Sequence, residues 1–223
     1  MQAEVCSYRL TYRGKPIGSQ TLSTHHQGRL AFLESKLMMQ GPLGTASVTQ
    51  KSKLNRQFFE SISFSEDSQE QGSRRTFQVL FDREAGLIKA SKGSDKSSVP
   101  LIRPVLDPLA LLYRVRYLKD KALLRVPMLG KDAVVEHLMD TTLETNLGEK
   151  EASVYKLHPG DSLIYVEKAS PQLILMMTQR FDGQSVDANI VKLSHEAVRN
   201  TPQRSNKRSN RRPKRRRPHR SKS

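Results

Sequence analysis

The sequence is poor in the residues that cross-link a chain or anchor it in a membrane. It has a single cysteine, Cys6, so no disulfide can form within the chain. No stretch approaches the roughly eighteen continuous apolar residues that a membrane-spanning helix needs. The first residues, MQAEVCSYRLTYRG, lack the apolar run of a signal peptide. We therefore expect a cytoplasmic protein, or one of the periplasm or cell envelope if an export signal preceded Met1.

Acidic residues are absent from the end of the chain, because no Asp or Glu follows Glu196. Residues 201–223 also have no aliphatic or aromatic side chain, and they include three prolines. The formal net charge is +16, of which the eleven basic residues of this tail account for 11, leaving +5 on residues 1–200. Since such a segment cannot bury apolar surface and its like charges repel, we expect a disordered tail over 199–223 after a single β-rich domain over 1–198.

The tail is the candidate binding site. Its basic residues are Arg204, Lys207, Arg208, Arg211, Arg212, Lys214, Arg215, Arg216, Arg217, Arg220 and Lys222. Clustered cations bind nucleic acid by releasing condensed counterions, and arginine adds bidentate hydrogen bonds to phosphate. Polybasic segments also bind anionic membrane surfaces, and such a tail can simply be a solubilising extension. No base-reading motif accompanies it, so we expect binding that is indifferent to sequence.

The dominant period along the rest of the chain is two, as in half-buried strands. In CSYRLTYR, Cys6, Tyr8 and Leu10 fall on one side, and Ser7 and Arg9 fall on the other. About a dozen such segments follow, separated by turn sequences such as GPLG, SEDSQEQGS, HPGD and FDG. We expect a strongly curved antiparallel sheet or an open or closed β-barrel, since these folds reduce the number of exposed strand edges.

One segment differs from the strands. In LDPLALLYRVRYL, Asp107 is placed as an N-cap and Pro108 as the first helical residue, and apolar residues follow at helical spacing. The spacing predicts one short helix over roughly 108–118, which packs against the sheet.

The aromatic residues allow two interpretations. The segment FFESISF predicts a strand with Phe58, Ile62 and Phe64 on one face, and TFQVLF predicts one with Phe77 and Phe81 together. If exposed, such residues can stack on nucleic-acid bases. Aromatics at strand spacing are more often part of the core, and we favour that interpretation.

A search for catalytic or metal-binding patterns is negative. The six histidines lack the spacing or Cys partners of a metal site, and His25 and His26 are adjacent, which directs them to opposite faces of a strand. The stretch HPGDS brings His158, Asp161 and Ser162 together, but residues of one turn rarely form a triad. GPLGT lacks the pattern of a phosphate loop. We therefore expect a protein that is not an enzyme and has no cofactor or metal.

The chain also resembles a known family. The segments YRLTYRGKPIG, DPLALLYRVR, LIYVEKASPQLILMMTQRFDG and VDANIVKL are similar to those of a bacterial domain-of-unknown-function family of mostly exported all-β proteins. The resemblance covers about residues 5–193 and implies a short Asp-Pro-Leu helix between two β meanders. It implies no activity and no site residues. This chain departs from the family pattern in its arginine-rich tail and in showing no export signal.

Two functional hypotheses follow. The first is a non-enzymatic protein whose tail binds the phosphates of RNA or DNA, with the β domain as a scaffold or as a docking surface for an unidentified protein partner. The second is an envelope-associated, barrel-like protein that binds an apolar ligand, with the tail attached to anionic lipid or surface polymer.

Overall fold

The structure is a computed structural model that describes residues 2–118, 123–181 and 183–197. The eleven basic tail residues predicted to bind nucleic acid lie outside the described residues. The first eight strands are β1 (Gln2–Tyr12), β2 (Lys15–Gln27), β3 (Leu30–Gly41), β4 (Gly44–Asn55), β5 (Glu60–Glu70), β6 (Ser73–Asp82), β7 (Leu87–Lys92) and β8 (Asp95–Pro100). The helix α1 (Pro108–Val115) follows, and then β9 (Leu123–Val126), β10 (Ala133–Thr145), β11 (Gly148–His158), β12 (Ser162–Glu167), β13 (Ile174–Phe181) and β14 (Gln184–Ala197).

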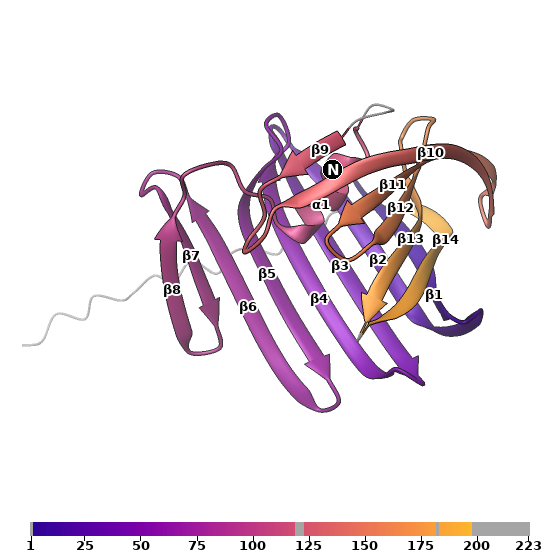
Figure 1. The fold of residues 1–223 in the computed structure, drawn as a ribbon, viewed down its shortest axis with the longest axis horizontal. Coiled ribbons are helices and arrows are strands. Elements are labelled where there is room, and N and C mark those ends of the chain that lie inside the picture. The colour runs from indigo at the N-terminus through magenta and orange to yellow at the C-terminus, as the bar shows by residue number, and fades with distance from the viewer. Residues whose placement is uncertain (1, 119–122, 182, 198–223) are drawn as a thin grey trace, which may run out of the picture.

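All fourteen strands form one antiparallel sheet, in the order β8-β7-β6-β5-β4-β3-β2-β1-β14-β13-β12-β11-β10-β9. Two meanders, one before and one after the helix, are joined by the pairing of β1 with β14. The strands on either side of the helix in sequence, β8 and β9, therefore lie at opposite edges of an open sheet. Figure 1 shows β1–β8 as a broad layer, with the later strands curling back across α1. The prediction of a strongly curved antiparallel sheet with one short helix is confirmed.

The predicted alternation holds in β1, where Cys6, Tyr8 and Leu10 are buried and Arg9 is exposed. Burial on one face of a strand is the main source of stability in such a sheet, and it fixes the register, because a shift by one residue would turn the apolar face outward. The hydroxyl of Tyr8 donates to the carbonyl oxygen of Ile174 at 2.8 Å. The first strand is thereby tied to the late meander by a hydrogen bond as well as by its ladder with β14.

The helix begins as predicted. The carboxylate of Asp107 accepts hydrogen bonds from the backbone N–H groups of Leu109 and Ala110, both at 3.0 Å, and Pro108 occupies the first turn. The same buried carboxylate accepts from the hydroxyls of Ser52 on β4, at 2.7 Å, and Ser61 on β5, at 2.6 Å. Asp107 therefore fixes the start of the helix to the early meander.

The end of the helix is earlier than the predicted residue 118. The regular α-helix ends at Val115, and the chain then tightens, since Tyr117 and Leu118 donate their backbone N–H groups to carbonyls three residues back, those of Arg114 and Val115. Arg116, which closes the helix, directs its guanidinium into the sheet. It donates to both carboxylate oxygens of Glu4 on β1, at 2.7 and 3.2 Å.

Two local predictions are wrong. Phe58 lies in the β4–β5 connection and is 58% exposed, so it does not share the buried face of Phe64. The reason is that β5 begins only at Glu60, after a turn in which Phe59 adopts a positive φ of 51°. The stretch SEDSQEQGS was predicted as a turn, but residues 65–70 continue β5, and only Gln71 and Gly72 separate it from β6. Alternating polar residues can form a strand where both neighbouring strands supply hydrogen bonds.

Candidate functional site

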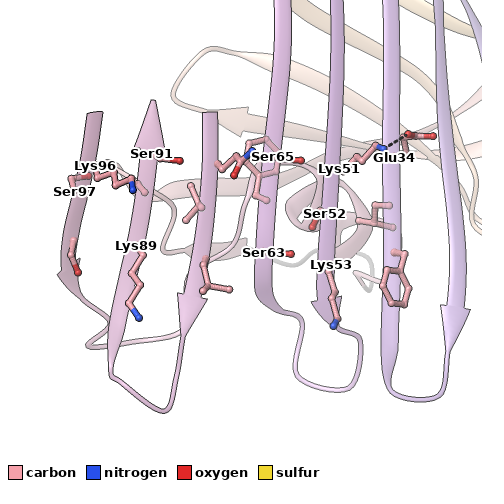
Figure 2. A pocket seen from close by; sticks show the side chains of 18 of the residues that line it. Glu34, Lys51, Ser52, Lys53, Ser63, Ser65, Lys89, Ser91, Lys96 and Ser97 are labelled. Atoms are coloured by element: carbon pink, nitrogen blue, oxygen red, sulfur yellow. Dashed lines mark ion pairs between the residues drawn. The ribbon is translucent and has the colours of Figure 1, made fainter. Parts of the chain in front are cut away.

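The face of β2–β8 that is turned away from the helix carries a broad open hollow of about 1270 Å³. It spans all seven strands, and Figure 2 looks onto the face from which its side chains project. The register orders these side chains into two parallel rows. The first row is His25, Phe32, Lys53, Ser63, Leu80, Lys89 and Ser98, and the second is Ser23, Glu34, Lys51, Ser65, Gln78, Ser91 and Lys96.

The orientation of this face follows from strand alternation. Ser52 points inward, because its hydroxyl donates to Asp107 at the start of the helix. Its neighbours Lys51 and Lys53 must then point outward, into the hollow. The remaining members of the two rows share this orientation through their cross-strand partners. The hollow thus lies on the solvent-facing side of the sheet, opposite the face that packs against the helix.

The hollow is lined by four lysines and one glutamate. Glu34 pairs with Lys51 at 3.4 Å and with Lys36, just outside the hollow, at 2.9 Å. Lys89 pairs with Asp82 at 2.6 Å. Within the described part of the chain, neither Lys53 nor Lys96 has an ion-pair partner. Positive charge therefore exceeds negative charge on this face.

Phe32 is enclosed by its neighbours on this face. The ring of His25 stacks on it in parallel, with centroids 4.7 Å apart, and the Lys53 ammonium group lies 5.7 Å from the ring centroid. Partial burial lowers the pKa of His25, so the stacked imidazole is neutral at pH 7. The stacked pair of His25 and Phe32 therefore adds contact area to the hollow without adding charge. The faces of the Phe32 ring are already covered by His25 and Lys53.

Hydroxyl and amide groups fill the space between the lysines. Ser63, Ser65, Gln78 and Ser91 lie in the middle of the two rows, on β5, β6 and β7. Ammonium, hydroxyl and amide groups are the side chains that proteins use against phosphate and sugar oxygens, because each offers hydrogen-bond donors that suit an anion. The hollow can therefore bind an extended anionic ligand through many weak, adaptable contacts.

The space between the helix and the first strands, by contrast, is largely filled. Between α1 and strands β1–β3 there remains a void of about 30 Å³, bordered by the Glu4–Arg116 ion pair, Cys6 and Tyr113. Such a void holds about one water molecule, whereas pockets for drug-sized ligands measure roughly 300–1,000 Å³. Side chains of the helix thus fill most of the space between α1 and these strands.

The structure shows where the histidines considered in the sequence lie. His25 and His26 point to opposite faces as predicted, since His25 lies in the hollow and Nε2 of His26 is 3.0 Å from the hydroxyl of Tyr113 on the helix. His158 lies between Glu136, at 3.2 Å, and Asp161, at 3.7 Å, in an exposed charge cluster. Among residues 2–118, 123–181 and 183–197, no three His, Cys, Asp or Glu side chains are grouped as metal ligands would be. Within the same ranges, no helix is long and apolar enough to cross a bilayer.

Sequence reasoning missed the hollow, although one signal was present. In KSKL, residues 51–54, the period of two already directs Lys51 and Lys53 to the same face. Lys89 and Lys96 could not be added to them from the pattern, because neither β7 nor β8 was among the predicted strands and the strand order was unknown. It is the register across five strands that brings these four lysines onto one surface.

Comparison with known proteins places the chain in a family. Residues 7–187 match the family model described as "Protein of unknown function (DUF3108)". The chain belongs to this family. The predicted resemblance to an all-β domain-of-unknown-function family, with one short helix between two meanders, is thereby confirmed. No curated protein matches this DUF3108 chain.

A solved structure shares the fold of the DUF3108 chain. It is a β-barrel-like protein of the domain of unknown function DUF1849 from Brucella abortus, with a TM-score of 0.56 and 8% sequence identity. The match covers 88% of this chain and 99% of that one. At this identity the likeness concerns the architecture alone, so the function has to be argued from the residues themselves.

Proposed function

We propose that this protein is a non-enzymatic nucleic-acid-binding protein that holds phosphates through its basic C-terminal tail, irrespective of base sequence. The β domain serves as the scaffold, and the hollow on β2–β8 is its own contact surface for the same polyanion. No catalytic role is assigned to any residue, and the proposed binding requires no cofactor.

The observation that carries this proposal is the composition of residues 201–223, in which eleven of twenty-three residues are basic and none is acidic. Arginine outnumbers lysine there by eight to three. The guanidinium group favours phosphate because it donates two parallel hydrogen bonds to its oxygens. Each phosphate neutralised also releases condensed counterions, and this gain does not depend on base sequence.

The hollow supports the proposal from within the described domain. Its lysines and hydroxyls lie on a solvent-facing surface, with Lys53 and Lys96 free of ion-pair partners among the described residues. Contacts to phosphate and sugar account for half to two-thirds of the hydrogen bonds between proteins and DNA, and they come from these side-chain types. A tail and a folded surface of the same charge would attract the same ligand.

The proposal is tested by fluorescence-anisotropy titration of labelled random-sequence RNA and DNA with two proteins of equal length. One is the full chain, and in the other the eleven basic tail residues are replaced by Gln. We expect the replacement to weaken binding at least about 100-fold at low salt. Each basic residue that neutralises a phosphate releases counterions, so the loss of many such residues removes most of the affinity. Unchanged affinity would contradict the proposal.

Anionic vesicles form a further arm of the same experiment. If the full chain bound phosphatidylglycerol vesicles through its tail and did not bind nucleic acid, the tail would be a membrane-attachment segment and the proposal would be wrong. Phosphatidylcholine vesicles are the matched control, because they offer the same surface without net negative charge.

A further inference from the structure

We propose that one end of the sheet docks on an anionic membrane surface through exposed apolar side chains and arginines. This goes beyond the proposed function, because it concerns another surface of the domain and another ligand. The surface consists of the connections after β2, β4, β6 and β8 and of the end of α1. Its residues are 28–29, 56–59, 83–86, 101–106 and 114–117, and we call it the turn end.

The parts of the turn end lie side by side. In the antiparallel sheet β2, β4, β6 and β8 run in one direction, so the connections that follow them lie at the same end of the broad layer (Figure 1). The backbone N–H of Arg56 donates to the carbonyl oxygen of Arg29 at 2.9 Å, which joins the β2–β3 and β4–β5 connections. Arg83 of the β6–β7 connection pairs with Glu60, at the start of β5, at 2.8 Å. These three connections therefore form a continuous rim.

Large apolar side chains on this rim are exposed. Phe58 of the β4–β5 connection is 58% exposed, and Ile102, two residues after β8, is 87% exposed. The backbone N–H of Leu101 donates to the carbonyl oxygen of Gly86 at 2.8 Å, which places the segment of Ile102 beside the β6–β7 connection. Tyr117, at the end of α1, is 41% exposed. Exposed apolar side chains that gather on one surface mark sites of interaction with proteins, membranes or ligands.

The outward position of Phe58 is supported by the residue that follows it. Phe59 has a positive φ of 51°, which is rare for a bulky side chain. Its ring centroid lies 6.1 Å from those of both Tyr113 and Tyr117, and the Arg114 guanidinium lies 5.7 Å from it. Such a backbone conformation persists only where the surrounding structure holds it. Phe59 thus fastens the connection to the helix, while Phe58 faces solvent.

Positive charge surrounds the exposed apolar groups. The turn end contains six arginines and one acidic residue, Glu84. Within residues 2–118, 123–181 and 183–197, three of these arginines, Arg29, Arg56 and Arg114, have no ion-pair partner. Basic side chains beside a membrane are attracted by the negative surface potential of anionic lipid. The charge of the turn end therefore complements such a surface.

The mixture of side chains favours lipid over nucleic acid or a protein. Bases stack on aromatic rings, whereas Ile102 has no ring and is the most exposed of these residues. The bilayer interface accepts aliphatic and aromatic groups alike, and arginine lays its stem along apolar surface while its guanidinium stays among the headgroups. A protein partner needs a closely fitted surface. The exposed groups of the turn end belong to separate connections, which a fluid surface accommodates.

The first test places a reporter in the turn end. Because the chain has no tryptophan, Phe58→Trp introduces its only indole. The protein is the full-length chain whose eleven basic tail residues are replaced by Gln, so the tail charge cannot attract the vesicles. With phosphatidylglycerol vesicles we expect the emission to shift to the blue and to be quenched by brominated lipid. Met38→Trp is the matched control, since Met38 is 66% exposed on β3, and its emission should stay unchanged.

The second test measures the affinity for the same vesicles by co-sedimentation. Phe58→Ser combined with Ile102→Ser should lower it at least about tenfold, because two apolar groups no longer leave water. The control combines Met38→Ser with Met139→Ser, two side chains that are 66% and 59% exposed elsewhere, and it should change the affinity less than twofold. Circular dichroism verifies that both variants are folded.

The third test concerns charge. Arg29→Gln combined with Arg56→Gln should lower the affinity for phosphatidylglycerol vesicles at least about fivefold, because each arginine near the surface adds to the attraction. The same change should leave the weaker binding to phosphatidylcholine vesicles unaltered. Arg13→Gln combined with Arg75→Gln removes two exposed arginines at the opposite end of the sheet and should have less than half of this effect.

Three results would overturn the inference. An unchanged emission of the Phe58→Trp reporter would show that the turn end does not enter the bilayer. Equal losses for the turn-end and control replacements would remove the assignment to this surface. Turn-end replacements that weakened RNA binding and left vesicle binding intact would assign the surface to nucleic acid. The proposed function is tested by RNA binding of the tail replacements, so the two proposals fail independently.

Discussion

Replacing Arg116 by Met should be among the most damaging single changes in the domain. The Arg116 side chain is 8% exposed, and it joins three parts of the fold. Besides the two bonds to Glu4 on β1, it donates from Nε to the carbonyl of Gln172 at 2.8 Å and from Nη2 to that of Pro171 at 2.9 Å. The helix, the first strand and the β12–β13 connection are thus held by one guanidinium.

The expected cost follows from what the substitution leaves behind. Met preserves much of the volume and apolar contact, but it leaves the largely buried Glu4 carboxylate without its cation, and two carbonyls without a donor. Breaking a buried ion pair by removing one partner costs about 3–5 kcal/mol. Domains are commonly stable by about 5–15 kcal/mol, so the loss is a large share of the total. A double variant, Arg116→Met with Glu4→Leu, should recover part of it, because no buried charge is left unpaired.

The assay is urea denaturation followed by far-ultraviolet circular dichroism, since the chain has no tryptophan. Arg114→Met is the matched control. Arg114 belongs to the same helix, and its guanidinium lies 5.7 Å from the centroid of the Phe59 ring. A loss below about 1 kcal/mol for Arg116→Met, or one no greater than that of the control, would refute the reasoning.

Three further predictions concern single residues. Burial raises the pKa of the Asp107 carboxyl, although the hydrogen bonds to this group act in the opposite direction. A raised pKa in the folded state means that the group contributes its full share to the free energy of unfolding below about pH 4. That share is lost as the pH rises through the raised pKa. The free energy of unfolding of the Asp107→Asn variant, measured by urea titration, should therefore increase relative to that of the wild type between pH 4 and pH 7. A difference between the two proteins that stays constant with pH would contradict this. Burial also raises the pKa of the Cys6 thiol to about 11, so a thiol reagent at pH 8 should modify the folded protein far more slowly than the unfolded protein, and equal rates would count against the assigned environment. A Cβ at Gly18 would lie 2.1 Å from the carbonyl oxygen of Met38 on the paired strand. Gly18→Ala should therefore lower the free energy of unfolding by about 1–3 kcal/mol in thermal or urea denaturation. A loss as small as that of the neighbouring Ser19→Ala would show that the two strands can move apart easily.

The strand faces and the helix start could be predicted because they depend on local patterns. The alternation of Cys6, Tyr8 and Leu10 is enough to place them in the core, and Asp107 followed by Pro108 is enough to start the helix. The exposure of Phe58 could not be predicted. Two phenylalanines before a strand look the same in the sequence whether they belong to the strand or to the connection that precedes it. Its exposure depends on where the β4–β5 connection turns.

The candidate surface depends on contacts between residues far apart in sequence. Lys51 and Lys96 are forty-five positions apart, and they share a face only because β4 through β8 are consecutive antiparallel neighbours. The filling of the space beside the helix was also beyond local patterns. The alternation of apolar residues is the same in a barrel that encloses a cavity and in a sheet that curls around a helix. The Arg116–Glu4 pair, which joins residues 112 positions apart, marks the second arrangement.

The most direct test of the proposed function is the salt dependence of nucleic-acid binding by the full chain and by the chain ending at residue 200, measured by anisotropy with random-sequence RNA. We predict a log–log slope of at least about 5 in magnitude for the full chain, and an affinity lower by at least about 100-fold for the shortened chain. Comparable affinity and slope for the two proteins would contradict the assignment of phosphate binding to the tail.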